Sequence, residues 1–457
     1  MSSLPFHVAV VGAGASGNLV AANFKRFAPN GRLALIGNSS KPGKGVAYET
    51  MYCVNLLNVP AGNMSAFPDD MNHFVAWLKT RFPDSHAGTF ASRITYGDYL
   101  ADIFSSTVKE NSNIEYVEGD VISVSREHEY WKLQLKNGST IFAHAVVLAF
   151  GNLLAPNDPI DFRDVEKLYW KNPWSEDVAL GLEKDAPVLL VGTGLTMVDV
   201  ALSLREVGHR GTIHALSRNG RLYQVHKPYQ ARPLADLPDE FNSPRGAIRW
   251  IREHVNIAEH TGSDWRAVID SLRPHTAAIW QKWSLAQRKS FLRHARNLWD
   301  IHRHRMSPEV ADQIGALIED RILKIHRGKL ISAKQNGDLA QVTWQQTDTK
   351  EISTLNVARI VNCTGPSRDY SKIESPLIAQ LIKAGHIVPD QLRLGFDTDQ
   401  DGRFVNIQCE PVQGLFTLGP VRIPALWESL AIPEIRNQAK ALAKLLVDET
   451  IEAGIPT

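Results

Sequence analysis

The sequence predicts an α/β protein built around two copies of a strand–turn–helix unit. Three observations support this fold class. A glycine-rich turn follows the apolar run Phe6–Val11, a second such turn follows Pro187–Val191, and each turn leads into a segment with helical spacing. The chain has 457 residues, of which 44% are hydrophobic and 22% charged. That length and composition are typical of a globular protein with two or three well-filled domains.

The first unit is a buried strand, the turn at 12–17 and a helix expected from Asn18 to about Phe27. The turn has the spacing G-x-G-x-x-G, in which the first glycine permits a sharp bend, the second a close approach to a pyrophosphate, and the third close helix–strand packing. The unpaired N–H groups at the start of the helix would hold that pyrophosphate. We therefore predict a dinucleotide site that contains Gly12, Gly14, Ala15, Ser16 and Gly17.

The next strand, Arg32–Ile36, ends without the acidic residue that normally binds the adenosine ribose. That position holds Gly37 or Asn38. The side-chain oxygen of Asn38 or the hydroxyl of Ser39 could replace the acid, and a plain turn is the alternative.

Glycine, proline and asparagine then fill much of residues 41–68, which predicts a long ordered loop of the kind that often carries function. Helices are expected over His73–Phe82 and after Arg93. A β-meander is expected over Ile114–Val124, Trp131–Leu135 and Thr140–Ala149. The last strand ends at Gly151, where the backbone can approach a ligand closely.

The second unit is a strand at Pro187–Val191, a turn at 192–197 and a helix over Val198–Val207. Its predicted nucleotide contacts are Gly192, Thr193, Gly194, Leu195 and Thr196. Met197 replaces the third glycine, so we expect helix and strand to lie slightly further apart. Arg218 follows the strand Thr212–Leu216 and favours NADP over NAD, because a guanidinium suits a 2′-phosphate. The alternative is a solvated surface arginine.

Residues 243–322 have helical spacing and many tryptophans, which usually form core. The cluster His302–Arg305 is either a solvated or structural face or a site for an anion. Strands are expected again at Leu339–Gln345 and Val357–Val361, and a helix at Ile432–Val447.

The charge balance gives no reason to expect a nucleic-acid partner, because 50 basic residues oppose 49 acidic ones. No apolar run reaches the roughly 18 to 20 residues of a membrane helix, so we expect a cytoplasmic protein. Cys53, Cys363 and Cys409 are far apart and form no C-x-x-C pair. Neither a disulfide framework nor a metal site is expected, and nothing indicates an oligomeric state.

Four motifs make the chain similar to the two-dinucleotide-binding flavoproteins, and most closely to an FAD/NAD(P)-binding family. They are G-x-G-V-A-Y at Gly43–Tyr48, L-N-V-P-A-x-x-M-S at Leu57–Ser65, Y-G-x-Y-L at Tyr96–Leu100 and W-E-S-x-A-I-P-E-I-R at Trp427–Arg436. The resemblance implies an FAD domain built from both ends of the chain with an NAD(P) domain inserted between them. The implied boundaries are 1–165, 166–355 with a helical insertion at about 240–325, and 356–457.

The same resemblance places further residues at the FAD. They are Val46, Ala47, Asn58, Met64, Ser65 and, at the flavin pyrimidine, Gly419 and Pro420. It implies an FAD-dependent NADPH oxidoreductase, with NADH as a possible donor. The leading hypothesis is a monooxygenase that delivers oxygen from a flavin C4a-hydroperoxide to a small molecule, for which a urate-like heterocycle is a plausible substrate.

Candidate substrate-pocket residues are Arg422, Trp427, His226 and Arg303. Two other function classes remain open. One is an NAD(P)H oxidase or single-cysteine disulfide reductase that uses Cys53. The other is a non-catalytic redox or nucleotide sensor that retains the folds without turnover.

Overall fold

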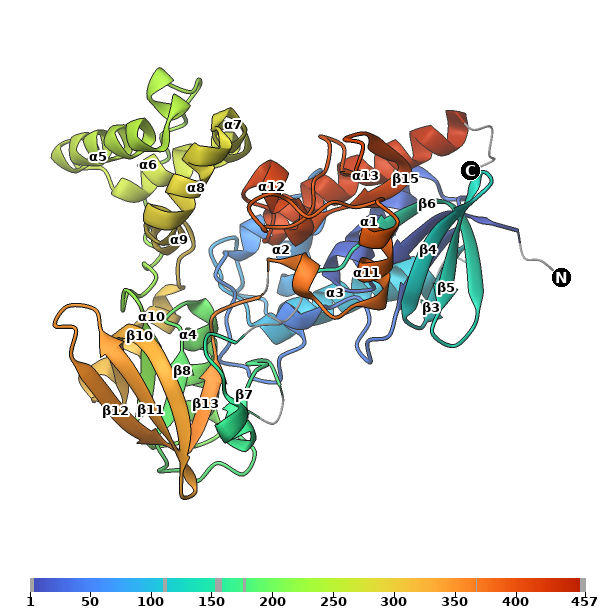
Figure 1. Ribbon diagram of the computed structural model, residues 1–457. Coiled ribbons are helices and arrows are strands. Elements are labelled where there is room, and N and C mark those ends of the chain that lie inside the picture. The colour runs from blue at the N-terminus through green and yellow to red at the C-terminus, as the bar shows by residue number, and fades with distance from the viewer. Residues whose placement is uncertain (1–3, 110–112, 153–157, 176–177, 367, 453–457) are drawn as a thin grey trace.

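A computed structural model describes residues 4–109, 113–152, 158–175, 178–366 and 368–452. Within these ranges the chain forms two sheet-based domains and a group of helices (Figure 1). Both ends of the described chain lie at the first domain. In the described part no helix combines the length and apolarity needed to cross a membrane.

The first domain has a central parallel sheet of order β14-β15-β6-β1-β2-β3, in which only β14 runs antiparallel to its neighbour. Its apolar strands are buried on both faces, as expected for such a sheet. The strands are β1 (Phe6–Val11), β2 (Leu33–Gly37), β3 (Ile114–Glu118), β4 (Val121–Glu127), β5 (Tyr130–Leu135), β6 (Thr140–Leu148), β14 (Arg403–Val405) and β15 (Pro411–Thr417). The helices are α1 (Ala15–Phe27), α2 (His73–Lys79), α3 (Arg93–Lys109), α11 (Pro376–Lys383), α12 (Ile423–Leu426) and α13 (Ile432–Glu452).

The two ends of the chain complete one sheet. Strand β15 lies parallel to β6, with Leu415 opposite Val146, and the Thr417 hydroxyl donates to the Leu148 carbonyl at 2.7 Å. Helix α13 packs along α1, and both contribute to one hydrophobic core. The first domain therefore contains residues from both ends of the chain, as the resemblance implies.

The second domain has a sheet of order β12-β11-β10-β9-β8-β13-β7, parallel except at β11 and β12. Its strands are β7 (Tyr169–Trp170), β8 (Val188–Val191), β9 (Ile213–Ser217), β10 (Leu323–Asn336), β11 (Leu339–Gln346), β12 (Ile352–Val357) and β13 (Arg359–Asn362). Helices α4 (Leu195–Glu206) and α10 (Pro308–Glu319) share a core with this sheet. Met197 is fully buried in that core.

The helical insertion consists of α5 (Pro244–His260), α6 (Trp265–Ser271), α7 (Thr276–Lys282), α8 (Leu285–His294) and α9 (Arg296–Arg303). Ser243, Asp264 and Ser284 cap α5, α6 and α8 with their side chains. The insertion contacts the first domain through α7 and α12, where Trp280 Nε1 donates to the Pro424 carbonyl at 2.7 Å. This helical unit is therefore fixed to the C-terminal part of the first domain.

Three of the expected boundaries differ from the observed ones. The segment Ile114–Val124 is not one meander strand, because β3 pairs in parallel with β2 and only β4, β5 and β6 form an antiparallel meander. The second domain does not end at 355, because β13 pairs with β8 and carries the sheet to Asn362. The insertion ends at Arg303, since α10 packs on α4 and β10.

Candidate functional site

The first glycine turn has the geometry of a pyrophosphate cradle. Gly12 has φ +111°, and a Cβ there would lie 2.3 Å from the Ala149 carbonyl oxygen. A Cβ at Gly17 would lie 1.9 Å from the Gly12 carbonyl oxygen, so no side chain fits at either position. At Gly14 the nearest atom to such a Cβ would be the Gly45 Cα at 3.4 Å. Gly14 is thus the one glycine of the turn at which a small side chain would fit the fold.

Helix α1 begins at this turn with unsatisfied donors. No side chain caps Gly14, no acidic residue occupies the first turn, and the N–H groups of Ala15, Ser16 and Gly17 make no hydrogen bond within the described chain. Such a helix start carries a partial positive charge and binds anions. The residues present therefore fit a dinucleotide pyrophosphate.

The loop with the G-x-G-V-A-Y motif lies against this turn. The Gly43 N–H donates to the Ala13 carbonyl at 2.7 Å, and Gly45, with φ +80°, lies against Gly14. Val46 is 49% exposed, and Ala47 follows it in a short 3₁₀ helix. The apolar side chain of Val46 is therefore exposed to solvent close to the cradle, where a bound cofactor would bury it.

Asn38 pairs with an acidic residue that the sequence analysis did not identify. Its Nδ2 donates to Asp120 Oδ1 at 2.6 Å, and both side chains are exposed. Asp120 follows β3, which neighbours β2 in the sheet. A carboxylate therefore lies beside Asn38, at the end of the strand next to β2, and the expectation of β3 as a meander strand did not reveal it.

The loop at 57–65 is held by Arg436. Arg436 Nη1 donates to the carbonyls of Asn63 and Ser65, each at 3.0 Å, and the Tyr96 hydroxyl donates to the Met64 carbonyl at 2.9 Å. Three of the four family motifs therefore meet at this loop. Burial lowers the pKa of Arg436, a group that the sequence analysis did not single out.

Gly419 lies at the C-terminal side of the same cradle. It has φ +76°, and a Cβ there would lie 3.4 Å from Ser16 Oγ. Its N–H donates to Gln438 Oε1 at 3.0 Å, and its carbonyl accepts from the Ser429 hydroxyl at 2.6 Å. The N–H of Gly419, which the resemblance places at the flavin, thus already has a partner in Gln438. Gly151 follows β6, the strand that pairs with β15. Its carbonyl accepts a hydrogen bond from the Tyr370 hydroxyl.

The second turn repeats the geometry of the first. Gly192 has φ +123°, and a Cβ there would lie 2.5 Å from the Cys363 carbonyl oxygen. Helix α4 begins at Gly194 without a side-chain cap or an acidic residue in its first turn. The Thr193 hydroxyl lies 2.8 Å from Ser217 Oγ and fixes the turn against β9. The N-terminus of α4, with Leu195 and Thr196, is thus a second anion site.

Arginines surround this second turn. Arg218 is exposed and makes no side-chain hydrogen bond or ion pair in the described chain. Arg368 likewise has no ion-pair partner among the described residues, and burial together with the charge of Arg296 lowers its pKa to about 10. Tyr223, which interacts with Arg368, lies within 3.7 Å of a Cβ built on Gly194. Positive charge is therefore available where a nucleotide phosphate would lie.

The four candidate pocket residues do not form one site. Arg422 is 5% exposed and donates to the carbonyls of Asp399 and Gln400. Arg303 pairs with Glu428 and Glu434. Both are anchors within the fold, and Trp427 alone of the four lines the cavity of the helical insertion.

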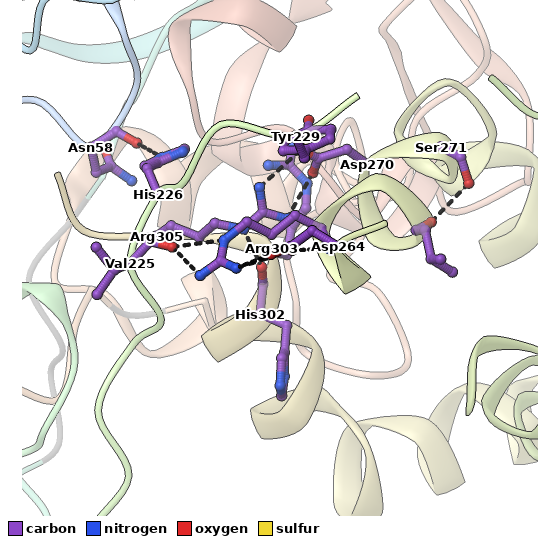
Figure 2. Close-up of polar contacts among 12 residues, drawn as sticks. Asn58, Val225, His226, Tyr229, Asp264, Asp270, Ser271, His302, Arg303 and Arg305 are labelled. Carbon is purple, nitrogen blue, oxygen red and sulfur yellow. Dashed lines mark hydrogen bonds and ion pairs between the residues drawn. The ribbon is translucent and has the colours of Figure 1, made fainter. Parts of the chain in front are cut away.

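His226 belongs to a different contact, between the two domains. Its Nε2 lies 3.0 Å from the Asn58 carbonyl, so it reaches the loop at 57–65 (Figure 2). Burial lowers the pKa of His226, which favours the neutral imidazole. Behind it, Arg305 pairs with Asp270 at 2.8 Å and is 2% exposed. The segment that carries His226 is thus fixed at both domains.

The cysteines do not form a redox site. The Cys53 N–H donates to Glu206 Oε1 at 3.1 Å, at the C-terminal end of α4. Since α4 has 12 residues, Cys53 lies roughly 18 Å from the start of the helix at the second turn. All three cysteines are free, and burial raises the pKa of the Cys363 thiol. Cys53 therefore lies at the far end of α4 from the second turn.

The comparisons with known proteins agree with this architecture. Residues 9–153 match the model of an FAD-NAD(P)-binding family. No curated protein sequence matches the chain.

Solved structures resemble the chain over nearly its full length. L-lysine 6-monooxygenase from Pseudomonas syringae has a TM-score of 0.69 at 16% identity, covering 97% of this chain and 99% of that one. Ornithine N-hydroxylase from Kutzneria sp. 744, with reduced FAD, NADP⁺ and L-ornithine, has 0.67 at 14%, covering 98% and 100%. Bacillithiol disulfide reductase from Bacillus cereus has 0.55 at 14%, covering 98% and 100%. Residues 9–153 therefore resemble an FAD-NAD(P)-binding domain, and over nearly its full length the chain shares its fold with these solved structures.

Proposed function

We propose that the protein is an FAD-dependent NADPH oxidoreductase that acts as a monooxygenase on a small molecule. The observation that carries this proposal is the pair of uncapped helix starts, at α1 and α4, each after a glycine turn and each in its own parallel sheet. Two such sites in one chain suit an electron donor and an electron acceptor. FAD, when bound, supplies hydride acceptance and oxygen activation.

The first turn would hold FAD. The free N–H groups of Ala15 and Ser16 bind the pyrophosphate, and the Asn38–Asp120 pair faces the adenosine ribose. Arg436 keeps the Asn63–Ser65 backbone in place, and Ser429 with Gln438 fixes Gly419. These hydrogen bonds would keep in place the backbone that borders a bound FAD.

The second turn would hold NADPH. Gly194 and the start of α4 bind its pyrophosphate, and Arg218 binds the 2′-phosphate through its fork of N–H donors. Arg368 adds a positive charge beside Tyr223. NADH lacks the 2′-phosphate and is the weaker donor in this proposal.

The cysteine arrangement favours a monooxygenase over a disulfide reductase, although both classes occur among the structural neighbours. A disulfide reductase of this fold needs a thiol that can reach the flavin. In the described chain Cys363 is buried behind the second turn, and Cys53 and Cys409 are isolated and exposed. No dithiol is available to take electrons from the flavin.

Stopped-flow spectroscopy of the purified protein tests the proposal. We expect NADPH to bleach the flavin absorbance under anaerobic conditions, faster than NADH does, and O₂ to restore it. Oxygenated product should then form with a substrate present. A flavin that neither nicotinamide reduces would contradict the proposal and favour a sensor without turnover. Reduction that yields only hydrogen peroxide with every small molecule offered would contradict the monooxygenase reaction.

A further inference from the structure

The helical insertion encloses a cavity that no nucleotide turn contributes to. Its volume is about 450 Å³, and its walls come from helices α5–α9, from Phe241 and from Trp427. Small-molecule sites typically have volumes of roughly 300 to 1,000 Å³. The cavity is therefore large enough for a small organic ligand.

The walls of this cavity are mostly aliphatic and aromatic, including Ile248, Ile251, Trp265, Leu272, Trp299 and Trp427. Protein interiors contain few voids larger than a water molecule. Apolar walls of this kind offer water few hydrogen-bond partners. An apolar ligand matches this lining better than water does.

Positive charge lies at one side of the cavity. A neighbouring groove shares Arg252 with it and adds Arg245 and Arg249, which lie on successive turns of α5. All three are exposed and form no ion pair among the described residues, although Glu253 also lines the groove. The other acid, Glu259, lines the cavity two turns further along α5. The groove therefore favours a negatively charged group beside an apolar space.

Trp427 links this cavity to the first nucleotide turn. Its ring stacks on Trp280 at 4.8 Å and meets Phe291 edge-on at 5.0 Å. Its backbone is held at φ +61°, ψ −61°, which is rare for a residue with a side chain. Two residues later, the Ser429 hydroxyl donates to the carbonyl of Gly419. One short segment thus forms a cavity wall and part of the cofactor cradle.

We propose that this cavity is the substrate site, and that the substrate has an apolar, preferably aromatic, body with a single anionic group at one end. The role of this ligand as a substrate rests on the proposed function, whereas its binding to the cavity does not. The chemistry differs from that of a urate-like heterocycle, whose polar edge the walls would leave unpaired. It also differs from that of a cationic amine, which the arginines repel.

Calorimetric titration of the complete protein with three probes tests the binding. The probes share one ring system: naphthalene-2-carboxylate, the neutral 2-naphthalenemethanol and the cationic 2-naphthylmethylamine. We expect saturable 1:1 binding of the carboxylate, at least about tenfold tighter than binding of the amine. Absence of saturable carboxylate binding, or equal affinity for all three probes, would overturn the proposal.

Three variants locate the bound probe. Ile251→Trp fills the cavity and should abolish binding of both the carboxylate and the alcohol. Arg252→Gln, at an exposed position that should tolerate the change, should weaken the carboxylate about tenfold and leave the alcohol unchanged. Arg293→Gln on α8, which lines neither space, is the matched control and should change nothing. If the Arg252→Gln variant binds the carboxylate with wild-type affinity, the proposal is also overturned.

NADPH oxidation measured with a panel of aryl and alkyl carboxylates then tests the substrate role. At least one carboxylate that binds should accelerate oxidation over the concentration range of its titration, and Ile251→Trp should lose this acceleration. If carboxylates bind and none changes the rate in a protein whose flavin NADPH reduces, the cavity is not the substrate site. If no nicotinamide reduces the flavin, the proposed function fails, and the titrations alone decide whether the cavity binds the anion.

Discussion

Arg303 Nη2 lies 2.9 Å from Glu428 Oε2, and the two side chains, each 9% exposed, join the helical insertion to the C-terminal part of the first domain. Glu428 also accepts from Trp299 Nε1 at 3.1 Å, and Glu434 lies 3.4 Å from the same guanidinium. These groups fix the insertion beside the segment that carries Trp427. The orientation of the cavity relative to the cofactor cradle therefore depends on a buried charge network.

Arg303→Met should destabilise this contact strongly. It leaves Glu428 buried without its cation, which typically costs about 3 to 5 kcal/mol, whereas Glu434 keeps Arg273 at 3.5 Å. Urea unfolding followed by tryptophan fluorescence measures the loss, because the insertion contains many of the tryptophans. The double variant Arg303→Met/Glu428→Gln should be more stable than Arg303→Met alone. Wild-type stability in the single variant would contradict a structural role for the pair.

Alanine substitutions at Gly14 and Gly194 should each impair the binding of a different cofactor. A Cβ at Gly14 or Gly194 meets its nearest atom at 3.4 Å or 3.7 Å, so both variants should fold. Gly14→Ala should lower the FAD content of the purified protein, because the side chain occupies the pyrophosphate approach. Gly194→Ala should retain FAD and slow its reduction by NADPH about tenfold or more. Identical effects of the two variants on FAD content would refute the assignment of the two turns.

Arg218→Ala should raise the KM for NADPH about tenfold and leave the KM for NADH almost unchanged. The reason is the loss of a charge-assisted contact to the 2′-phosphate, worth roughly 1.5 kcal/mol. Steady-state kinetics with both nucleotides measures the change, and NADH is the internal control. A parallel increase for both donors would place Arg218 elsewhere on the nucleotide.

Cys53→Ser should keep wild-type rates of NADPH oxidation. The cysteine lies beside Glu206 at the far end of α4 from the second turn, and its thiol is exposed, so its removal should leave that turn intact. Steady-state NADPH oxidation by the purified variant checks this expectation. A loss of activity at unchanged FAD content would revive a redox role for this thiol.

The free energy of unfolding of the second domain should decrease in acid, because His214 takes up a proton more readily in the unfolded state. Its Nδ1 lies 2.9 Å from His326 Nε2, and burial together with the His326 charge lowers the pKa of His214 to about 4. Between pH 4 and the ordinary value near 6.5, the unfolded state binds more protons than the folded one. Stability therefore rises with pH across that window, by at most about 3 kcal/mol from this group.

Thermal unfolding of His214→Gln between pH 4 and 7 checks that expectation. The variant should show a flatter dependence of Tm on pH than the wild type. His260→Gln, at an exposed position on α5, should parallel the wild type. An unchanged slope in His214→Gln would assign the acid sensitivity to other groups.

Local features of the site could be predicted from the sequence. Close backbone contacts leave no room for a side chain at Gly12, Gly17 and Gly192. Glycine is therefore needed at these positions, and the sequence shows this as the fixed spacing of glycines in each turn. The strand before each turn and the helix after it follow from the same short stretch.

Relationships between distant segments could not be predicted. Asp120 meets Asn38 only because β3 lies beside β2, and Arg303 meets Glu428 across 125 residues. The pairing of β13 with β8 likewise depends on the whole sheet. A hydrophobic pattern shows that a strand exists without showing which strand it joins. These partners therefore required the structure.

The position of β15 has a consequence for synthesis of the chain. Because β15 and α13 complete the sheet and core that hold Gly12–Gly17, the first domain has no finished fold while only its N-terminal part has left the ribosome. The second domain and the insertion, by contrast, are contiguous in sequence and can fold earlier. If this domain binds FAD as proposed, a nascent chain halted before residue 411 should bind none, because β15 has not yet joined the sheet.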